Sequence, residues 1–311
     1  MKGVKLIACS SNRKLWEEVS ERLGIPLADT LITTFSDGEV RVQINESVRG
    51  CEVYVLASLS HPVNHHLMEL FLTIDAVKRS SPKKIVAVVP YYAYGRQDRQ
   101  DRPRTPISAK VVADLLQRVG AQHVVVVDLH SPQIQGFFDV PLEHLTAIPV
   151  LYDYIKNNLV LNDPVVVSPD AGGVKRARDL ANKLGCGIAV ILKRRPEPNK
   201  AEVMDVVGEL EGKDAIIVDD IIDTAGTLTA AANLLINRGA RRVIACATHG
   251  IFSGPALERL TKAPVEKVIV TNTLPLEGKQ FNKLEVVSVA PLLAEAIKRM
   301  HEGASISSLF S

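Results

Sequence analysis

Short apolar runs alternate with longer amphipathic stretches along the whole chain. The apolar runs predict strands at residues 5–8, 52–57, 84–89, 124–128, 164–168, 188–192, 215–218, 242–247 and 265–270. The amphipathic stretches predict helices at residues 14–23, 65–79, 108–119, 171–184, 228–237 and 290–300. This alternation indicates an α/β fold, in which mainly parallel sheets are flanked by helices.

One segment, residues 35–49, interrupts the alternation. Its tight turn, Ser36-Asp37-Gly38-Glu39, lies between a threonine-rich segment and an alternating one. This pattern predicts a small β hairpin that projects as a flag.

The chain also repeats itself. Residues 115–124 match residues 234–243, and the strand from Ile85 aligns with the strand from Ile216. The spacing of the two matches differs by 12 residues, so the first copy carries an insertion between Pro90 and Lys110. We therefore expect two tandem related domains, at residues 1–146 and 147–294, with residues 295–311 packing back on the first.

The run at residues 215–227 carries the most distinctive chemistry. It is predicted to be a buried strand that ends on Asp219 and Asp220, followed by a loop of small and hydroxylated residues and a helix from about residue 228. A loop at a helix N-terminus offers backbone N–H groups to a phosphate. The two acids need another partner, such as sugar hydroxyls or a metal. The run therefore predicts a pocket for a phosphorylated sugar.

The alternative for this run is an ordinary strand–turn–helix, with Asp223 or Thr224 as the N-cap. That reading explains one acid near the helix start. It does not explain two adjacent acids at the end of a buried strand.

Two basic segments follow other predicted strands. The insertion at residues 91–106 has four arginines in nine residues, and Lys193-Arg194-Arg195 ends another strand. Both could be solvated surface charges. Open α/β sheets, however, bind ligands at the carboxyl ends of their strands, and arginine forks grip phosphates. We expect the insertion to close over a polyphosphate and the second segment to stabilise a phosphoryl transition state.

His130 and Asp170 also follow predicted strands. A lone histidine in such a place is more often structural. Asp170, however, begins a turn of small residues that leads into a helix. Together the imidazole and the carboxylate could hold one divalent ion, and Mg²⁺ is the expected metal where phosphates are present.

Composition limits the class of protein. In this chain of 311 residues, 46% are hydrophobic and 23% charged, as in globular enzymes, and a formal net charge of +2 does not indicate a nucleic-acid partner. The four cysteines show no C-x-x-C spacing, which favours a reducing cytoplasm over disulfides or metal knuckles. We expect no membrane association, because no apolar run approaches the roughly 20 residues of a spanning helix. There is also no P-loop motif.

With these segments in view, the chain closely resembles the ribose-phosphate pyrophosphokinases (phosphoribosyl pyrophosphate synthetases), in particular the long-chain, phosphate-activated class. The resemblance implies two tandem domains of phosphoribosyltransferase type. The segments that carry it span nearly the whole chain: residues 35–39, 94–98, 128–139, 168–170, 193–195 and 219–227.

The resemblance implies transfer of the β,γ-pyrophosphoryl group of ATP to the C1 hydroxyl of ribose 5-phosphate. The products would be AMP and 5-phospho-α-D-ribose 1-diphosphate, for nucleotide biosynthesis. It assigns magnesium to His130 and Asp170, and catalysis to Lys193, Arg195 and Arg96. The implied ATP-binding residues, with the flag donated by a neighbouring subunit, are Phe35, Asp37, Gly38, Glu39, Arg96 and Gln97. Those implied for ribose 5-phosphate are Arg195, Asp219, Asp220, Asp223, Thr224, Ala225, Gly226 and Thr227.

The same resemblance implies a cytoplasmic homo-oligomer, a hexamer built from dimers. It also implies phosphate as an activator and ADP as an inhibitor, at Ser47, Arg49, Ser81, Ser305, Ser307 and Phe310. Two alternatives remain. A phosphoribosyltransferase would share residues 219–227 but would not need the basic segments, since it has no ATP to bind. A non-catalytic synthetase-associated regulatory subunit would be expected to carry damaged catalytic loops.

Overall fold

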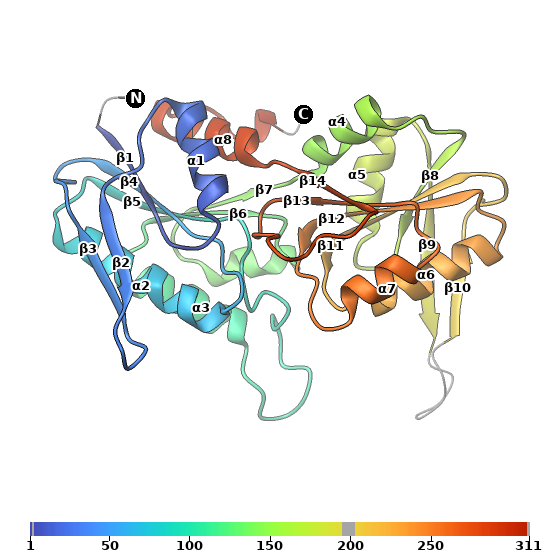
Figure 1. The fold of residues 1–311 in the computed structure, drawn as a ribbon, viewed down its shortest axis with the longest axis horizontal. Helices are drawn as coiled ribbons and strands as arrows, with labels where there is room; N and C mark the ends of the chain where they lie inside the picture. The colour runs from blue at the N-terminus through green and yellow to red at the C-terminus, as the bar shows by residue number, and fades with distance from the viewer. Residues whose placement is uncertain (2, 195–202, 310–311) are drawn as a thin grey trace. The chain divides into compact units, whose positions relative to one another are not determined.

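The computed structural model describes residues 1, 3–194 and 203–309. The chain forms two compact units. Unit 1 comprises Met1–Thr146, Thr273–Pro275 and Ser288–Ser311, and unit 2 comprises Ala147–Asn272 and Leu276–Val287. Each unit has a mainly parallel sheet with helices packed on it, which confirms the predicted α/β class (Figure 1).

The sheet of unit 1 has five parallel strands in the order β1-β4-β5-β6-β7. Parallel strands covered on both faces consist of nearly continuous apolar residues, and every residue of β6 is buried. The strands are β1 (Val4–Ala8), β4 (Glu52–Leu56), β5 (Lys84–Val89), β6 (His123–Val127) and β7 (Leu142–Leu145). The helices are α1 (Arg13–Leu23), α2 (Val63–Arg79), α3 (Ser108–Val119), α8 (Ala290–Glu302) and two short 3₁₀ helices, Pro132–Phe137 and Ser307–Leu309.

A two-stranded antiparallel hairpin, β2 (Thr30–Thr34) and β3 (Val40–Ile44), belongs to the same unit. The prediction of a hairpin around the Ser36–Glu39 turn is therefore confirmed. Its predicted bounds, residues 35–49, were wrong, because the β-branched residues before the turn form the first strand and pair from Thr30 onward.

The sheet of unit 2 has seven strands in the order β10-β9-β8-β11-β12-β13-β14, and only β10 runs antiparallel to its neighbour. The strands are β8 (Pro164–Ser168), β9 (Gly187–Arg194), β10 (Val203–Val207), β11 (Asp214–Ile222), β12 (Arg242–Gly250), β13 (Lys267–Thr271) and β14 (Leu284–Val287). The helices are α4 (Ile148–Asn158), α5 (Val174–Leu184), α6 (Gly226–Asn237) and α7 (Ala256–Lys262).

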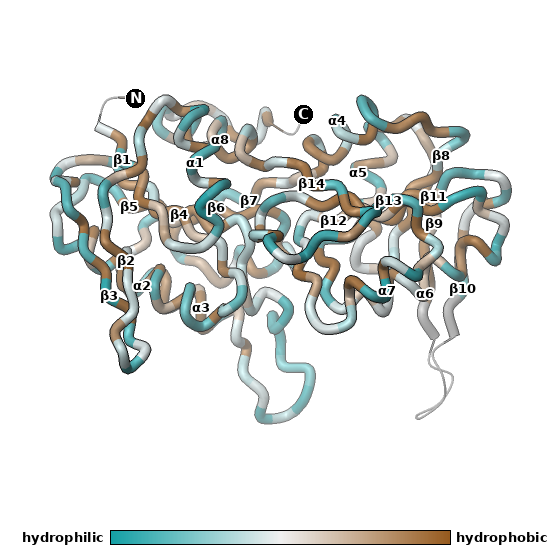
Figure 2. Tube along the Cα trace, viewed as in Figure 1, coloured by the Kyte–Doolittle hydropathy of each residue, from teal (hydrophilic) through white to brown (hydrophobic). Residues whose placement is uncertain are grey.

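The internal repeat corresponds to a repeated structural motif. In unit 1 the strand β5 is followed by α3 and β6, and in unit 2 the strand β11 is followed by α6 and β12. The two strands of each set are neighbours in their sheet. Residues 90–107 connect β5 to α3, whereas only residues 223–225 connect β11 to α6. The predicted insertion is therefore this long β5–α3 loop, which is coloured largely hydrophilic in Figure 2.

Several predicted bounds were wrong. The strand expected to end before Asp219 continues to Ile222, because β11 keeps pairing with β12 as far as Gly250. The helix α4 was not predicted, since Pro149 reads as a helix breaker, although proline is well tolerated in a first turn. The strands β7, β10 and β14 and the helix α7 were also missed. β7 and β14 have four residues and α7 has seven, which is too few to show a clear period, and β10 follows a segment with two prolines. No helix in the described part of the chain is long and apolar enough to cross a membrane.

Candidate active site

The predicted phosphate loop lies directly between β11 and α6. Ala225 occupies the N-cap position with a φ of 60°, a left-handed conformation that is uncommon for alanine. The first intrahelical bond runs from the Thr229 N–H to the Ala225 carbonyl at 3.0 Å. The preceding N–H groups of an α-helix have no intrahelical acceptor, and they carry the positive end of the helix dipole. The loop therefore has the backbone chemistry of an anion site.

Ser253 and Arg259, which both follow β12 in the chain, contact this loop and support it. The Ser253 hydroxyl donates to the Asp223 carboxylate, and the Ser253 N–H donates to the Asp223 carbonyl at 3.2 Å. From α7, Nη1 of Arg259 donates to the Thr224 carbonyl at 3.0 Å. A Cβ on Gly226 would lie only 3.3 Å from that nitrogen, so glycine permits this close approach. These hydrogen bonds tie the loop to the segment after β12 and to α7.

The acid pair lies within β11, and Asp220 and Asp219 precede the N-cap residue Ala225 by five and six residues. Asp220 keeps 7% of its side chain exposed and Asp219 keeps 31%. Burial and the neighbouring Asp220 carboxylate raise the pKa of Asp219 to about 8, while Arg176 acts in the opposite direction. Arg176 was missed in the sequence, where its only signal is a cation at the start of a helix.

Asp170 begins the turn that leads into α5. Its Oδ1 accepts a hydrogen bond from the Gly173 N–H at 2.9 Å, and the Ser168 hydroxyl donates to its carbonyl at 2.7 Å. A Cβ on Gly173 would come within 2.8 Å of the Ser168 Oγ, so the turn requires glycine there. Because this turn occupies residues 170–173, α5 begins at Val174 and not at 171 as predicted.

His130 lies in unit 1, just beyond β6, and is exposed. It therefore belongs to a different unit from Asp170, the other predicted magnesium ligand. Among the residues that the structure describes, no group of three or more histidines, cysteines or acids is arranged to hold a metal.

The arginine-rich loop lines a partly open cavity of about 400 Å³ in unit 1. Gln97 is anchored to the start of α3, since the Ser108 hydroxyl donates to its Oε1 at 2.6 Å and the Ala109 N–H donates to its carbonyl at 3.1 Å. The structure thus brings three predicted site residues, Arg96, Gln97 and His130, to one cavity. Its full lining is Arg96, Gln97, Asp98, Arg99, Asp101, Thr105, Pro106 and His130.

The tip of the hairpin presents the other predicted ATP-binding residues. The Phe35 N–H donates to the Glu39 carbonyl at 2.8 Å, and the Glu39 N–H donates to Oδ1 of Asp37 at 3.0 Å. Gly38 has a φ of 95°, which glycine adopts without strain. The Phe35 ring is 50% exposed, so the turn displays an aromatic surface beside two acids.

The predicted effector residues form two local groups in unit 1. The Arg49 N–H donates to the Ser47 hydroxyl at 3.5 Å, and the next residue's N–H donates to the Ser81 carbonyl at 3.0 Å. Near the C-terminus, the hydroxyls of Ser305 and Ser307 are 2.8 Å apart. Phe310 lies outside the described residues.

The remaining predicted residues come from the end of β9. The backbone of Lys193 pairs with Met204 on β10. Arg195 lies outside the described residues, so its predicted contact with the sugar phosphate stays a prediction.

Comparison with known proteins gives the family. Residues 4–120 match the model of the N-terminal domain of ribose phosphate pyrophosphokinase, and residues 195–311 match the phosphoribosyl synthetase-associated domain. The chain is 78% identical over 311 residues to the ribose-phosphate pyrophosphokinase of Aquifex aeolicus, covering 100% of both chains. The chain belongs to the ribose-phosphate pyrophosphokinase family. It is also 52% identical to the Bacillus subtilis member, covering 100% of this chain and 98% of that one.

A solved member of the family has the same fold. The phosphoribosylpyrophosphate synthetase from Mycobacterium smegmatis superposes with a TM-score of 0.92 at 45% identity, covering 97% of this chain and 100% of that one. The predicted family and the predicted fold class are therefore both confirmed.

Proposed function

We propose that this chain is a ribose-phosphate diphosphokinase. It transfers the β,γ-pyrophosphoryl group of ATP to the C1 hydroxyl of ribose 5-phosphate, giving AMP and 5-phospho-α-D-ribose 1-diphosphate. The observation that carries the proposal is the phosphate loop of unit 2. This loop directly follows β11, the strand that contains the acid pair. This arrangement, together with 78% identity to a protein of that name, supports a phosphorylated sugar as the acceptor.

In the proposed acceptor site, residues 223–227 bind the 5-phosphate. The helix N-terminus supplies N–H donors, and Thr224 and Thr227 add hydroxyls. Asp219 and Asp220 accept hydrogen bonds from the ribose hydroxyls, which orients C1. Arg195 adds a cation for the sugar phosphate.

The proposed donor site is the arginine-rich cavity of unit 1. Arg96 and Gln97 contact ATP there, and the guanidinium groups neutralise phosphate charge. The adenine is held by Phe35, Asp37 and Glu39 from the hairpin of a neighbouring copy. Support for this comes from the half-exposed Phe35 ring, which has an uncovered face to offer a planar base.

The proposed chemistry needs positioning and charge more than covalent catalysis. The C1 oxygen bonds to the β-phosphorus and releases its proton to water, the bond from that phosphorus to the α–β bridging oxygen breaks, and AMP leaves with that oxygen. Lys193, Arg195 and Arg96 stabilise the charge on the transferring group. No side chain has to act as a nucleophile.

The side chains of Asp170 and His130 have the chemistry to bind magnesium. Asp170 offers an exposed carboxylate and His130 an exposed imidazole at the arginine-rich cavity. Mg²⁺ commonly takes one or two protein ligands and completes its shell with water and substrate phosphates. When bound, it would neutralise charge on the ATP phosphates.

The further proposals concern assembly and regulation. We place the enzyme in the cytoplasm as a hexamer built from dimers, activated by phosphate and inhibited by ADP at the effector groups around Ser47 and Ser305. Light scattering tests the assembly. Rate measurements with added phosphate or ADP test the regulation.

The decisive experiment mixes the purified chain with MgATP and ribose 5-phosphate and measures AMP release. Equal amounts of AMP and diphosphate sugar are expected without any nucleobase. A phosphoribosyltransferase would instead need a nucleobase and the diphosphate sugar. A regulatory subunit would release no AMP. Either result would overturn the proposal.

A further inference from the structure

Arg176, in the first turn of α5, contacts both members of the acid pair. Its Nη1 lies 3.5 Å from Oδ1 of Asp219 and 3.4 Å from Oδ1 of Asp220. The Arg176 side chain is only 15% exposed, and that of Asp220 only 7%. Charges this far from water interact more strongly than charges on the surface.

Lys175, the residue before Arg176, has different surroundings. Lys175 pairs with Asp179 one helical turn further on, and the Lys175 side chain is 84% exposed. Exposed helical pairs of this kind contribute little to stability. Two neighbouring cations on one helix therefore have different surroundings, and only Arg176 reaches the acids.

The acid pair needs a shared partner for a geometric reason. Successive side chains of a strand leave on opposite faces, so adjacent carboxylates do not naturally point to one ligand. The Asp220 N–H donates to Oδ1 of Asp219 at 2.8 Å, which turns that carboxylate along the strand. The guanidinium lies within reach of both carboxylates in this arrangement. Without it, nothing at this position would offset the effect of burial and of Asp220, which already raise the pKa of Asp219.

We propose that Arg176 is the positioning residue of the acid pair, and that it holds both carboxylates in the orientation that accepts the vicinal hydroxyls of a pentose. This rests on the proposed function, which gives Asp219 and Asp220 to the ribose. Arg176 touches the acids and not the reacting atoms. Its effect is therefore on recognition of the sugar hydroxyls.

The test compares ribose 5-phosphate with 2-deoxyribose 5-phosphate, each with saturating MgATP. The ratio of kcat/KM for the two sugars measures how much the enzyme gains from the 2-hydroxyl. Arg176→Met should lower this ratio at least about 10-fold, through a higher KM for ribose 5-phosphate, because the carboxylates lose the ion pairs that orient them and then accept the sugar hydroxyls less well. The control Lys175→Met removes the neighbouring cation and should leave the ratio unchanged.

Three results would overturn the proposal. In one, Arg176→Met keeps the wild-type ratio. In another, it slows both sugars by the same factor, as a purely structural role predicts. In the third, the wild type does not distinguish the two sugars. A wild type that releases no AMP with ribose 5-phosphate would instead overturn the proposed function itself. If Arg176→Met does not fold, Arg176→Lys keeps a positive charge but not the Nη1 atom that lies near both acids, and should give a smaller fall in the same ratio.

Discussion

The backbone N–H of Leu129 donates a hydrogen bond to Nε2 of His144 across 2.9 Å. His144 lies on β7, opposite Val126 of β6, whereas Leu129 immediately precedes His130. Leu129 is 3% exposed, and Asp128 before it has a φ of 40°, a conformation with a steric cost. The imidazole on β7 therefore helps to hold the turn that presents His130.

Replacing His144 should disturb the donor site. In His144→Leu, the buried Leu129 N–H loses its acceptor, which costs about 1–3 kcal/mol. We expect a raised KM for MgATP and an unchanged KM for ribose 5-phosphate in steady-state assays. His144→Asn supplies another acceptor and should recover part of the loss. Equal changes in the two KM values would contradict this role.

Lys193 should act on the rate of the chemical step. Loss of one preorganised cation at a transferring group commonly lowers kcat by about 10²-fold or more. We therefore expect Lys193→Ala to have a kcat reduced by that amount with little change in either KM. Single-turnover measurements of AMP formation check the chemical step directly. An unchanged rate would remove Lys193 from the mechanism.

Arg259 should support the phosphate loop without touching the substrate. Arg259→Met removes the hydrogen bond to the Thr224 carbonyl, and the net contribution of one such bond is about 0.5–1.5 kcal/mol. We expect the KM for ribose 5-phosphate to rise about 2- to 10-fold at constant kcat. Lys262→Met on the same helix is the control, because Lys262 pairs only locally with Glu258 and is 74% exposed. The bracing role fails if the two variants behave alike.

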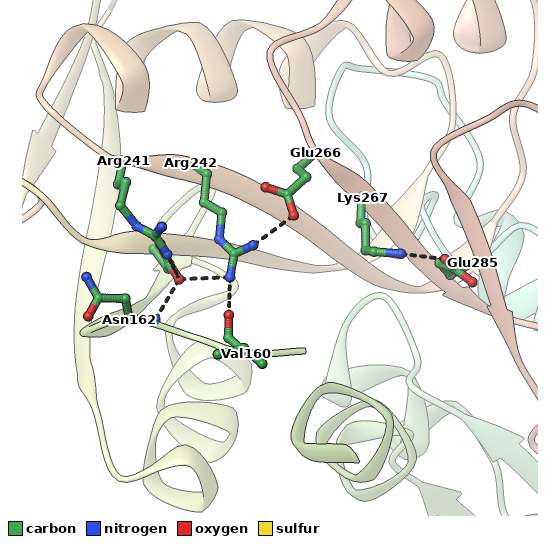
Figure 3. Close-up of polar contacts among 8 residues, drawn as sticks. Val160, Asn162, Arg241, Arg242, Glu266, Lys267 and Glu285 are labelled. Carbon is green, nitrogen blue, oxygen red and sulfur yellow. Dashed lines mark hydrogen bonds and ion pairs between the residues drawn. The ribbon is translucent and has the colours of Figure 1, made fainter. Parts of the chain in front are cut away.

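Asp214 should be important for the stability of unit 2. Its side chain has no exposed surface and accepts hydrogen bonds from Arg241 at 2.8 and 2.6 Å, from Arg242 at 3.0 Å and from the Asn162 N–H at 2.7 Å (Figure 3). Removing one partner of a buried ion pair costs about 3–5 kcal/mol. We expect a loss of this size for Asp214→Asn in denaturant unfolding. Glu285→Gln weakens the half-exposed pair with Lys267 and should cost at most about 1 kcal/mol.

The same network predicts that the stability of the protein decreases at acidic pH. Burial by itself would raise the pKa of Asp214, but the hydrogen bonds from Arg241, Asn162 and Arg242 outweigh it and hold the pKa below the ordinary value. A carboxyl with a lowered folded-state pKa stabilises the protein above its unfolded pKa, and this contribution is lost as the pH falls through the folded-state pKa. The free energy of unfolding of the wild type should therefore fall more steeply with decreasing pH than that of Asp214→Asn. Identical slopes would show that Asp214 is not responsible.

The sequence alone was sufficient for the fold class, the family and the kind of chemistry. These depend on local signals. Apolar runs separated by helical periods predict a parallel sheet, and residues 219–227 combine acids with a phosphate-type helix start in one continuous segment. The 12-residue change in spacing between the two matches of the repeat located the β5–α3 insertion, because both copies keep the same order of elements.

Only the tertiary structure decided which distant residues contact and orient these segments. Arg176 reaches Asp219 and Asp220 because α5 packs on the same sheet, 43 residues earlier in the chain than the first acid. His144 and Arg259 likewise act on loops to which no periodicity connects them. The extent of β11 beyond Asp219 depended on its pairing with β12. Packing and strand pairing join residues that are far apart in sequence, and a local pattern contains no information about which pairs will meet.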